Sequence, residues 1–314
     1  MVKFLIIGDL HGNKPIIHFK NFDAIIAPGD FCSDKYHRKL VNAWMKAEWN
    51  KGRAKMVDFD KFCKNTLKLT SQDLKSFQKK SLDRGREILE FLNSFGKPVF
   101  IIPGNWDQSI KGGEKSAKKV HIELMNRHKW FSSPYTNKKL TKGLKNVYDC
   151  QLRGFSFAGY NFVGYGITSV PELPEQKHWT LKKLKKKMTK GQWNLVKKSY
   201  AELLKKVEAP YLRLNKKQPL IFLSHNMPYN TSFDKIKKKG SPVNGKHYGS
   251  MIARDFILKH EPLVCIGGHM HEYFGKVKLG KTIVINGGFG AKVNTFLEVE
   301  GNKIKKVKFY PRPY

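Results

Sequence analysis

The sequence of 314 residues predicts an α/β fold organised as one domain over residues 1–314. Three observations support this prediction. Short runs that are apolar at every position recur along the chain, longer segments with helical spacing of apolar residues lie between them, and most runs end at a glycine followed by polar residues. Strands that alternate with helices are typical of sheets with parallel strands.

The predicted strands are about four residues long. Successive side chains of a strand point to opposite faces of its sheet, so a run that is apolar throughout is typical of a strand buried on both faces. The runs are Phe4–Ile7, Ala24–Ala27, Val99–Ile102, Leu220–Leu223, Leu263–Ile266 and Ile283–Ile285.

Two segments predict long helices. Apolar residues recur at helical spacing from Ser71 to Ser94, before Gly96 and Pro98 end the pattern. A lysine-rich segment at about 177–217 has the same spacing and predicts a helical hairpin inserted between core strands, with its apolar side packed inward. We favour a solvated charged face for its lysines over a lid that steers substrate.

Two regions have the short β-type runs and glycines of hairpins. The first extends from Tyr148 to Gly166. The second consists of 295–299 and 304–309, which flank Gly301-Asn302 and predict a closing hairpin.

Composition favours a cytoplasmic protein without a membrane partner. Of the residues, 40% are apolar, which is enough for a substantial core. The few apolar residues before Asp9 are too short a run for a signal peptide, and no run has the length of a transmembrane helix. The four scattered cysteines are typical of reduced thiols.

The formal net charge of +35 leaves two interpretations open. Clustered cations bind phosphates by releasing counterions, so a nucleic acid is one candidate partner. However, only nine of the 60 basic residues are arginine, and lysine is poorly suited to bidentate recognition. A general preference for lysine at the surface explains the charge equally well.

Side chains that can bind metals follow five of the predicted strands. Because residues at the carboxyl ends of strands in one sheet converge on one crevice, we expect them to lie together. They are Asp9 and His11, Asp30, Asn105, His225, and His269 with His271.

Seven donors are too many for one ion but suit two ions that share a carboxylate. The mixture of imidazole and carboxylate suits Mn, Fe, Co, Ni or Zn and disfavours calcium. We expect two divalent ions and favour manganese among these metals. Two ions about 3.5–4 Å apart can activate a nucleophile and neutralise phosphoryl oxygens in an in-line displacement.

The order of these motifs resembles the calcineurin-like metallophosphoesterases, whose pattern is D-x-H, GD, GN-H-D/E, a lone H and GH-x-H. The matching residues span positions 8 to 271. The resemblance implies a four-layer α/β/β/α sandwich with two mixed β-sheets and a metal-bridging hydroxide that attacks phosphorus. It also implies that Asp9, His11 and His271 bind one metal, that Asp30 bridges, and that Asn105, His225 and His269 bind the other.

The chain departs from the family pattern at Trp106, where most members have a histidine that stabilises the transition state or protonates the leaving oxygen. Indole has one N–H donor and cannot give up a proton at neutral pH. Asp107 keeps the acidic position that orients this histidine in the family. A replacement acid is His247, in a stretch that resembles an H-x-G-S segment of prokaryotic members; the alternative is an exposed loop histidine.

The predicted catalytic residues are therefore Asp30, Asn105, Asp107 and His247, and the remaining histidines, among them His37, are expected at the surface. The predicted function is hydrolysis of a phosphomonoester or phosphodiester. Two alternatives remain: a nuclease that holds DNA or RNA through its basic surface, and a non-catalytic binding scaffold. No motif specifies the substrate or an oligomeric state.

Overall fold

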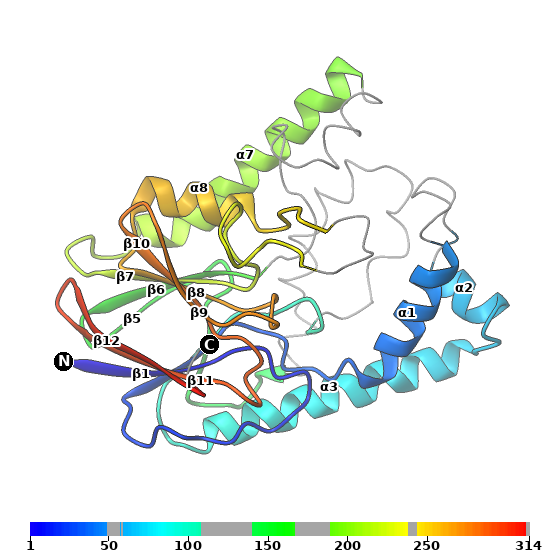
Figure 1. The fold of residues 1–314 in the computed structure, drawn as a ribbon, viewed down its shortest axis with the longest axis horizontal. Helices are drawn as coiled ribbons and strands as arrows, with labels where there is room; N and C mark the ends of the chain where they lie inside the picture. The colour runs from blue at the N-terminus through cyan, green and yellow to red at the C-terminus, as the bar shows by residue number, and fades with distance from the viewer. Residues whose placement is uncertain (49–56, 58, 108–139, 167–188, 238–243, 312–314) are drawn as a thin grey trace.

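The fold consists of two mixed six-stranded sheets covered by helices (Figure 1). The structure is a computed structural model that describes residues 1–48, 57, 59–107, 140–166, 189–237 and 244–311. The first sheet has the order β12-β11-β1-β2-β3-β4, with β1 Val2–Ile7, β2 Ala24–Ala27, β3 Val99–Ile101, β4 Val147–Asp149, β11 Asn294–Glu300 and β12 Lys303–Tyr310. The second has the order β5-β6-β7-β8-β10-β9, with β5 Gly154–Phe157, β6 Tyr160–Tyr165, β7 Leu220–Ser224, β8 Val264–Gly267, β9 Gly275–Leu279 and β10 Thr282–Asn286.

The central strands of both sheets are parallel. In the first sheet β1, β2, β3 and β4 run parallel, and β11 and β12 complete it with antiparallel pairing. In the second sheet β6, β7, β8 and β10 run parallel, and β5 and β9 form antiparallel edges. Within each sheet the parallel strands therefore end at the same edge, which is where the predicted ligands follow them.

The alternation of side chains along each strand produces two kinds of core. In β1, Phe4 and Ile6 face the layer between the two sheets, whereas Leu5 and Ile7 face the helical side. The inter-sheet layer contains a close aromatic stack of Phe100 on Phe162, with ring centroids 3.9 Å apart and planes at 4°. Both faces of β1 are thus buried, which explains its apolar run.

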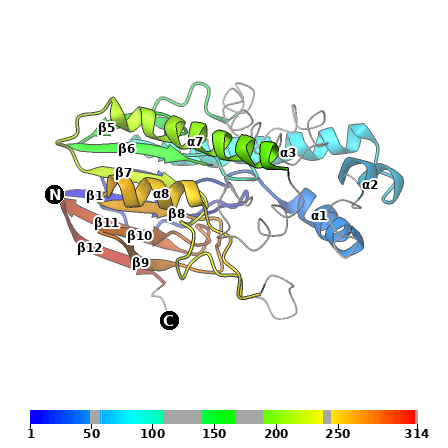
Figure 2. The same cartoon turned by 90° about the horizontal axis from the view of Figure 1, so that it is seen from above.

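Helices cover the outer face of each sheet. Helix α3 (Ser71–Asn93) packs on the first sheet, where its Leu89 and Leu92 are fully buried. Thr70 caps it, because its side chain accepts a hydrogen bond from the Asp73 N–H and Asp73 bonds back to the Thr70 N–H. Helices α7 (Lys190–Leu212) and α8 (Met251–His260) lie over the second sheet (Figure 2). Helices α1 (Lys35–Glu48) and α2 (Phe59–Asn65) lie beyond one end of the sheets. The predicted α/β/β/α sandwich is confirmed.

The sequence located most elements correctly. All six apolar runs are strands, the helix from residue 71 is α3, and β11 with β12 is the closing hairpin. The hairpin prediction for the region after Tyr148 is correct for β5 and β6 but wrong for β4. Strand β4 pairs in parallel with β3 and extends the first sheet, where Tyr148 stacks on Phe100 with ring centroids 5.4 Å apart.

The described part of the lysine-rich segment is α7. Its Leu203 and Val207 are buried against the second sheet, while Lys197 and Lys205 are exposed, as the solvated-face interpretation requires. The other predicted arm, residues 177–188, lies outside the described residues. The prediction of one domain with an insertion at about 177–217 stays a prediction. In the described part of the chain, no helix combines the length and apolarity needed to cross a membrane.

Replacement of Phe162 by alanine should destabilise the protein by about 3–5 kcal/mol, because it removes one ring of the Phe100 stack and leaves a cavity between the sheets. Unfolding in urea measures this loss. A matched control is Leu195→Ala on α7, where the side chain is 45% exposed. The control should change stability by no more than about 0.5 kcal/mol. Equal losses in both variants would contradict the assigned inter-sheet core.

Candidate metal centre

The predicted ligands follow the carboxyl ends of strands from both sheets. Asp9, Asp30 and Asn105 come after β1, β2 and β3, whereas His225 and His269 come after β7 and β8. The two sets of loops are joined directly, because the backbone N–H of His269 donates to Asp9 Oδ2 at 2.8 Å. The edges of the two sheets therefore meet at one centre.

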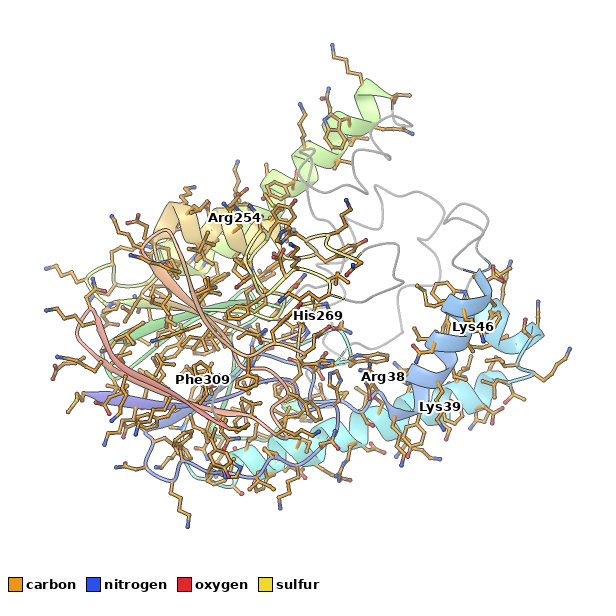
Figure 3. The ribbon with its side chains drawn as sticks, viewed as in Figure 1. Arg38, Lys39, Lys46, Arg254, His269 and Phe309 are labelled. Atoms are coloured by element: carbon orange, nitrogen blue, oxygen red, sulfur yellow. The ribbon has the colours of Figure 1, made fainter. Side chains whose placement is uncertain are left out.

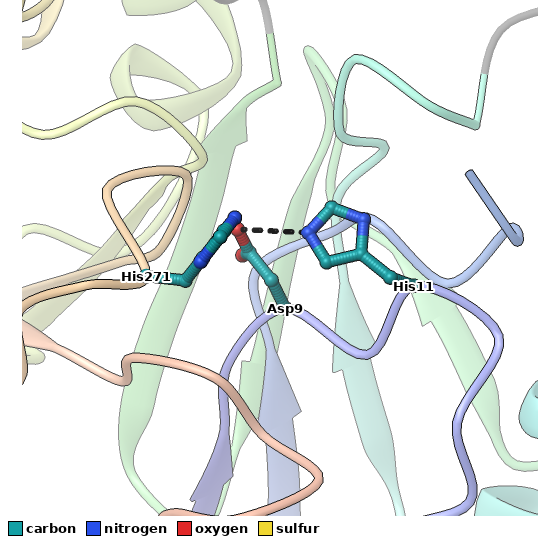
Figure 4. Close-up of side chains that lie close together, drawn as sticks. All are labelled: Asp9, His11 and His271. Carbon is teal, nitrogen blue, oxygen red and sulfur yellow. Dashed lines mark ion pairs between the residues drawn. The ribbon is translucent and has the colours of Figure 1, made fainter. Parts of the chain in front are cut away.

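The first group of side chains consists of Asp9, His11 and His271 (Figure 4). Each offers one ligand atom, and these atoms lie within 4.8 Å of one another. His11 Nε2 is 3.9 Å from Asp9 Oδ2, and the two imidazole rings are 5.0 Å apart at their centroids. Asp9 is fully buried. The spacing is suitable for one ion held between three side chains.

The second group consists of Asp30, His225 and His269, with ligand atoms also within 4.8 Å of one another. His225 Nε2 is 3.5 Å from Asp30 Oδ2. The same carboxylate oxygen of Asp30 is 3.9 Å from His11 Nε2 in the first group. Asp30 thus lies between the two groups, at the position where a bridging carboxylate is needed.

The terminal amide of Asn105 faces the second group. Its Oδ1 is 3.2 Å from His225 Nε2 and 2.9 Å from His269 Nδ1. In the opposite amide orientation the nitrogen donates to these two atoms and to Asp30 Oδ2, and the oxygen accepts from Trp106 Nε1 at 3.1 Å. Asn105 can therefore present an oxygen to a cation, or an NH₂ group whose two hydrogens can be donated to two of these three acceptors.

A backbone carbonyl fixes the tautomer of His225. Its Nδ1 is 2.6 Å from Pro28 O, so Nδ1 carries a proton and donates it in a hydrogen bond. The lone pair of the neutral ring is then on Nε2, which faces Asp30 and Asn105. A second hydrogen bond of this kind is the usual way in which proteins orient a histidine ligand.

Two glycines of the motifs are required because neighbouring atoms lie too close for a side chain. A side chain at Gly104 would come within 2.2 Å of Asp30 Oδ1, and one at Gly268 within 2.1 Å of Asp9 Oδ1. Strained backbone accompanies this crowding. His11, Asp30 and His269 have φ values of 46°, 56° and 63°, and such left-handed conformations are uncommon for residues with a side chain. Strain of this kind concentrates at functional sites.

Asp107 holds the loops after β2 and β3 together. Its fully buried carboxylate accepts hydrogen bonds from the backbone N–H groups of Asp30, Cys32 and Gly104 at 2.7, 2.8 and 2.8 Å. In addition, the backbone N–H of Trp106 donates to Asp30 Oδ1 at 2.7 Å. These contacts support a positioning role for Asp107, and its predicted catalytic role stays a prediction.

His247 is anchored by a buried carboxylate. Its Nδ1 is 2.7 Å from Asp234 Oδ1, and its side chain is 26% exposed. Asp234 also accepts from the backbone N–H groups of Asn230, Thr231 and Gly249, each at 2.9 Å. The ring is therefore oriented rather than free in a loop. The neighbouring Tyr248 carbonyl accepts from the side chain of Asn226, which is adjacent to His225.

Burial and mutual charge shift the pKa values of this centre strongly. Burial raises the pKa of Asp9 well above its usual value. Burial also opposes ionisation of Asp30, but His225, His11 and the Trp106 N–H together lower the Asp30 pKa to about 2. Conversely, burial disfavours a charged His225, yet Asp30 and Asp9 raise its pKa to about 9. Burial together with His225 lowers the pKa of His269 to about 3.

Unpaired polar atoms show that the residues fit metal ions. Among the described residues, Asp9 Oδ1 and His11 Nε2 are buried without a hydrogen-bond partner. Buried polar groups are normally paired, and cations between these side chains would satisfy both atoms. The donors are nitrogen and oxygen atoms, as expected for borderline or hard divalent metals.

Three residues near this centre were not predicted. Asp34 Oδ2 is 3.5 Å from His11 Nδ1 and pairs with Arg38. His37, expected at the surface, is buried, and its ring centroid is 6.4 Å from that of Trp106. Burial lowers the pKa of His37 and favours the neutral ring. The only sequence signal for this cluster is the i, i+4 spacing of Asp34 and Arg38 at the start of α1.

Comparisons with known proteins give one family match and several structural matches. The model of the calcineurin-like phosphoesterase family matches residues 2–273. One crystal structure has 15% identity, covers 97% of this chain and 97% of its own, and has a TM-score of 0.54, which shows a shared fold. The phosphopantetheinyl hydrolase PptH from Mycobacterium tuberculosis has 11% identity over 92% of this chain and 90% of its own, with a TM-score of 0.44. Purple acid phosphatase PPD1 from yellow lupin (Lupinus luteus) has 11% identity, covers 98% of this chain and 51% of its own, and has a TM-score of 0.43. No curated protein matches the sequence significantly.

Manganese should stabilise the protein through Asp30 and His225. At about 100 times its dissociation constant an ion adds about 2.7 kcal/mol, which corresponds to a rise in melting temperature of roughly 5–10 °C. We expect Asp30→Asn and His225→Ala to lose most of this rise in a thermal melt with Mn²⁺. The exposed His18 provides a control, and His18→Gln should keep the full rise. A rise that survives in Asp30→Asn would place the ions elsewhere.

Proposed function

Because the chain belongs to the calcineurin-like phosphoesterase family, we propose that it is a metal-dependent hydrolase that cleaves a phosphomonoester or a phosphodiester. The main support for this proposal is the position of Asp30 Oδ2 between the two groups of ligands, 3.5 Å from His225 and 3.9 Å from His11. A carboxylate shared between two metal positions is what a binuclear centre requires.

Two groups of residues would hold the ions. Asp9, His11 and His271 would bind one, and Asn105, His225 and His269 the other, with Asp30 shared. Manganese is the ion that we expect first. Two bound divalent ions would lower the pKa of water and neutralise phosphoryl oxygens. The pairing of Asp107 with three backbone N–H groups would keep Asp30 and Asn105 at a fixed separation during this chemistry.

Protonation of the leaving oxygen needs a group other than Trp106. We assign this role to His247, because Asp234 holds its Nδ1 and leaves Nε2 available for proton transfer. A ring oriented in this way by a buried carboxylate has the arrangement of a general acid or base. The substrate class stays broad, since monoesters and diesters both have a leaving oxygen.

Hydrolysis of bis-p-nitrophenyl phosphate and p-nitrophenyl phosphate tests the function. Wild-type protein with Mn²⁺ should turn over at least one of them. Asp30→Asn and His225→Ala should reduce kcat/KM by about 10³-fold, because the metal contribution of several kcal/mol is lost. The control His18→Gln should retain activity.

If the wild-type protein shows no metal-dependent turnover of either ester, the hydrolase proposal is contradicted. Single-stranded DNA serves as a further substrate. Cleavage of DNA that weakens steeply with salt would favour the nuclease instead, because phosphate contacts by lysine release counterions.

Leaving-group dependence tests the role of His247. His247→Gln should slow hydrolysis of an alkyl phosphate such as glycerol 2-phosphate by about 10²-fold and change the rate for p-nitrophenyl phosphate much less, because p-nitrophenolate leaves without a proton. Trp106→His should change the alkyl phosphate rate in the opposite direction. If His247→Gln slows both substrates equally, His247 is not the acid.

A further inference from the structure

Arg38 lies beside the candidate metal centre. It belongs to the first turn of α1, and Figure 3 shows it at the end of this helix nearer to His269, whereas Lys46 lies toward the other end. Its Cζ is 6.0 Å from the centroid of the Trp106 ring, so the guanidinium approaches the residue that replaces the usual histidine. An arginine over an aromatic ring is held in place by the ring quadrupole.

Asp34 connects Arg38 to the metal-binding residues. Nε and Nη2 of Arg38 both contact Asp34 Oδ2. The same oxygen is 3.5 Å from His11 Nδ1, on the side of the ring opposite to the Nε2 that faces Asp9 and Asp30.

The geometry leaves part of the guanidinium available to a ligand. The Arg38 side chain is 47% exposed, and its Nη1 makes no hydrogen bond to any residue that the structure describes. A purely structural ion pair at this exposure would contribute at most about 1 kcal/mol. The tethered Nε and Nη2 orient Nη1, which reduces the entropy cost of forming one more bond.

We propose that Arg38 binds the phosphoryl group of the substrate through Nη1 and supplies a positive charge that the indole of Trp106 cannot carry. This inference rests on the proposed phosphoesterase function. The surrounding groups Asp9, Asp30, Asp34 and Asp107 are acidic, so a phosphate entering the centre benefits from a cation at its rim. Guanidinium suits this role because it donates several parallel hydrogen bonds to phosphate oxygens.

Inorganic phosphate binding to the Mn²⁺-loaded protein, measured by calorimetry, tests the proposal without turnover. Arg38→Ala should weaken phosphate binding by about 10-fold or more, because hydrogen bonds to charged groups are among the stronger ones. Arg38→Lys should weaken it less, since the charge remains while the planar fork is lost. The exposed neighbour Lys39 on the same helix provides the matched control, and Lys39→Ala should bind phosphate as wild type does.

The Mn²⁺ affinity of each variant is measured in parallel. The Mn²⁺ affinity of Arg38→Ala should stay within about 2-fold of wild type. A loss of Mn²⁺ affinity as large as the loss of phosphate affinity would show that Arg38 acts only by orienting Asp34 and His11, and it would overturn the proposal. Unchanged phosphate affinity in Arg38→Ala, or no phosphate binding by wild type, would overturn it as well. Lack of ester hydrolysis by wild type defeats the proposed function separately, because phosphate binding is measured without turnover.

Discussion

The carboxylate of Asp107 is the contact on which the candidate metal centre depends. It accepts three backbone hydrogen bonds, from Asp30, Cys32 and Gly104, and so joins loops that follow two different strands. Each of these N–H groups would cost about 1–3 kcal/mol if left buried and unpaired. Burial and the nearby Asp30 carboxylate raise the pKa of Asp107 to about 6, whereas the hydrogen bonds from Gly104 and Cys32 act in the opposite direction and favour the charged form.

This contact explains how side chains from distant parts of the sequence reach common positions. The parallel strands bring Asp30 and Asn105 to one edge, but only their loops decide the separation of the two side chains. Gly104 lies directly against Asp30, and the backbone N–H of His269 donates to Asp9, so the loops of the two sheets are in direct contact. Asp30 and His269, two of the residues with left-handed φ values, donate their backbone N–H groups in these contacts.

Much of this arrangement could be predicted from the sequence because its causes are local or simply geometric. Apolar runs of strand length identified β1, β2, β3, β7, β8 and β10, and the convergence of parallel strand ends within one sheet accounts for Asp9, Asp30 and Asn105, whereas His225 comes from the second sheet. The assignment of each ligand to one of two metals came from the motif order, which resembles that of the family. The structure adds contacts that the sequence motifs do not contain, such as the hydrogen bond from His225 Nδ1 to the Pro28 carbonyl that fixes the tautomer of His225.

The features that were missed depend on contacts between segments with no common pattern. Strand β4 has the same composition as a hairpin strand, and only its pairing with β3 assigns it to the first sheet. His37 looked like a surface residue of a charged helix, but packing against Phe77 and Trp106 buries it. Arg38 resembled any other cation of a basic chain, and its proximity to Trp106 depends on how α1 docks.

The backbone of Trp106, rather than its side chain, is bonded to Asp30. The link from residue 106 to Asp30 uses the main-chain N–H, which every amino acid except proline has. The side chain at this position is half-buried and takes no part in that link. Any residue other than proline at position 106 would therefore keep the link to Asp30, whereas the bond from Trp106 Nε1 to Asn105 would be lost with the indole.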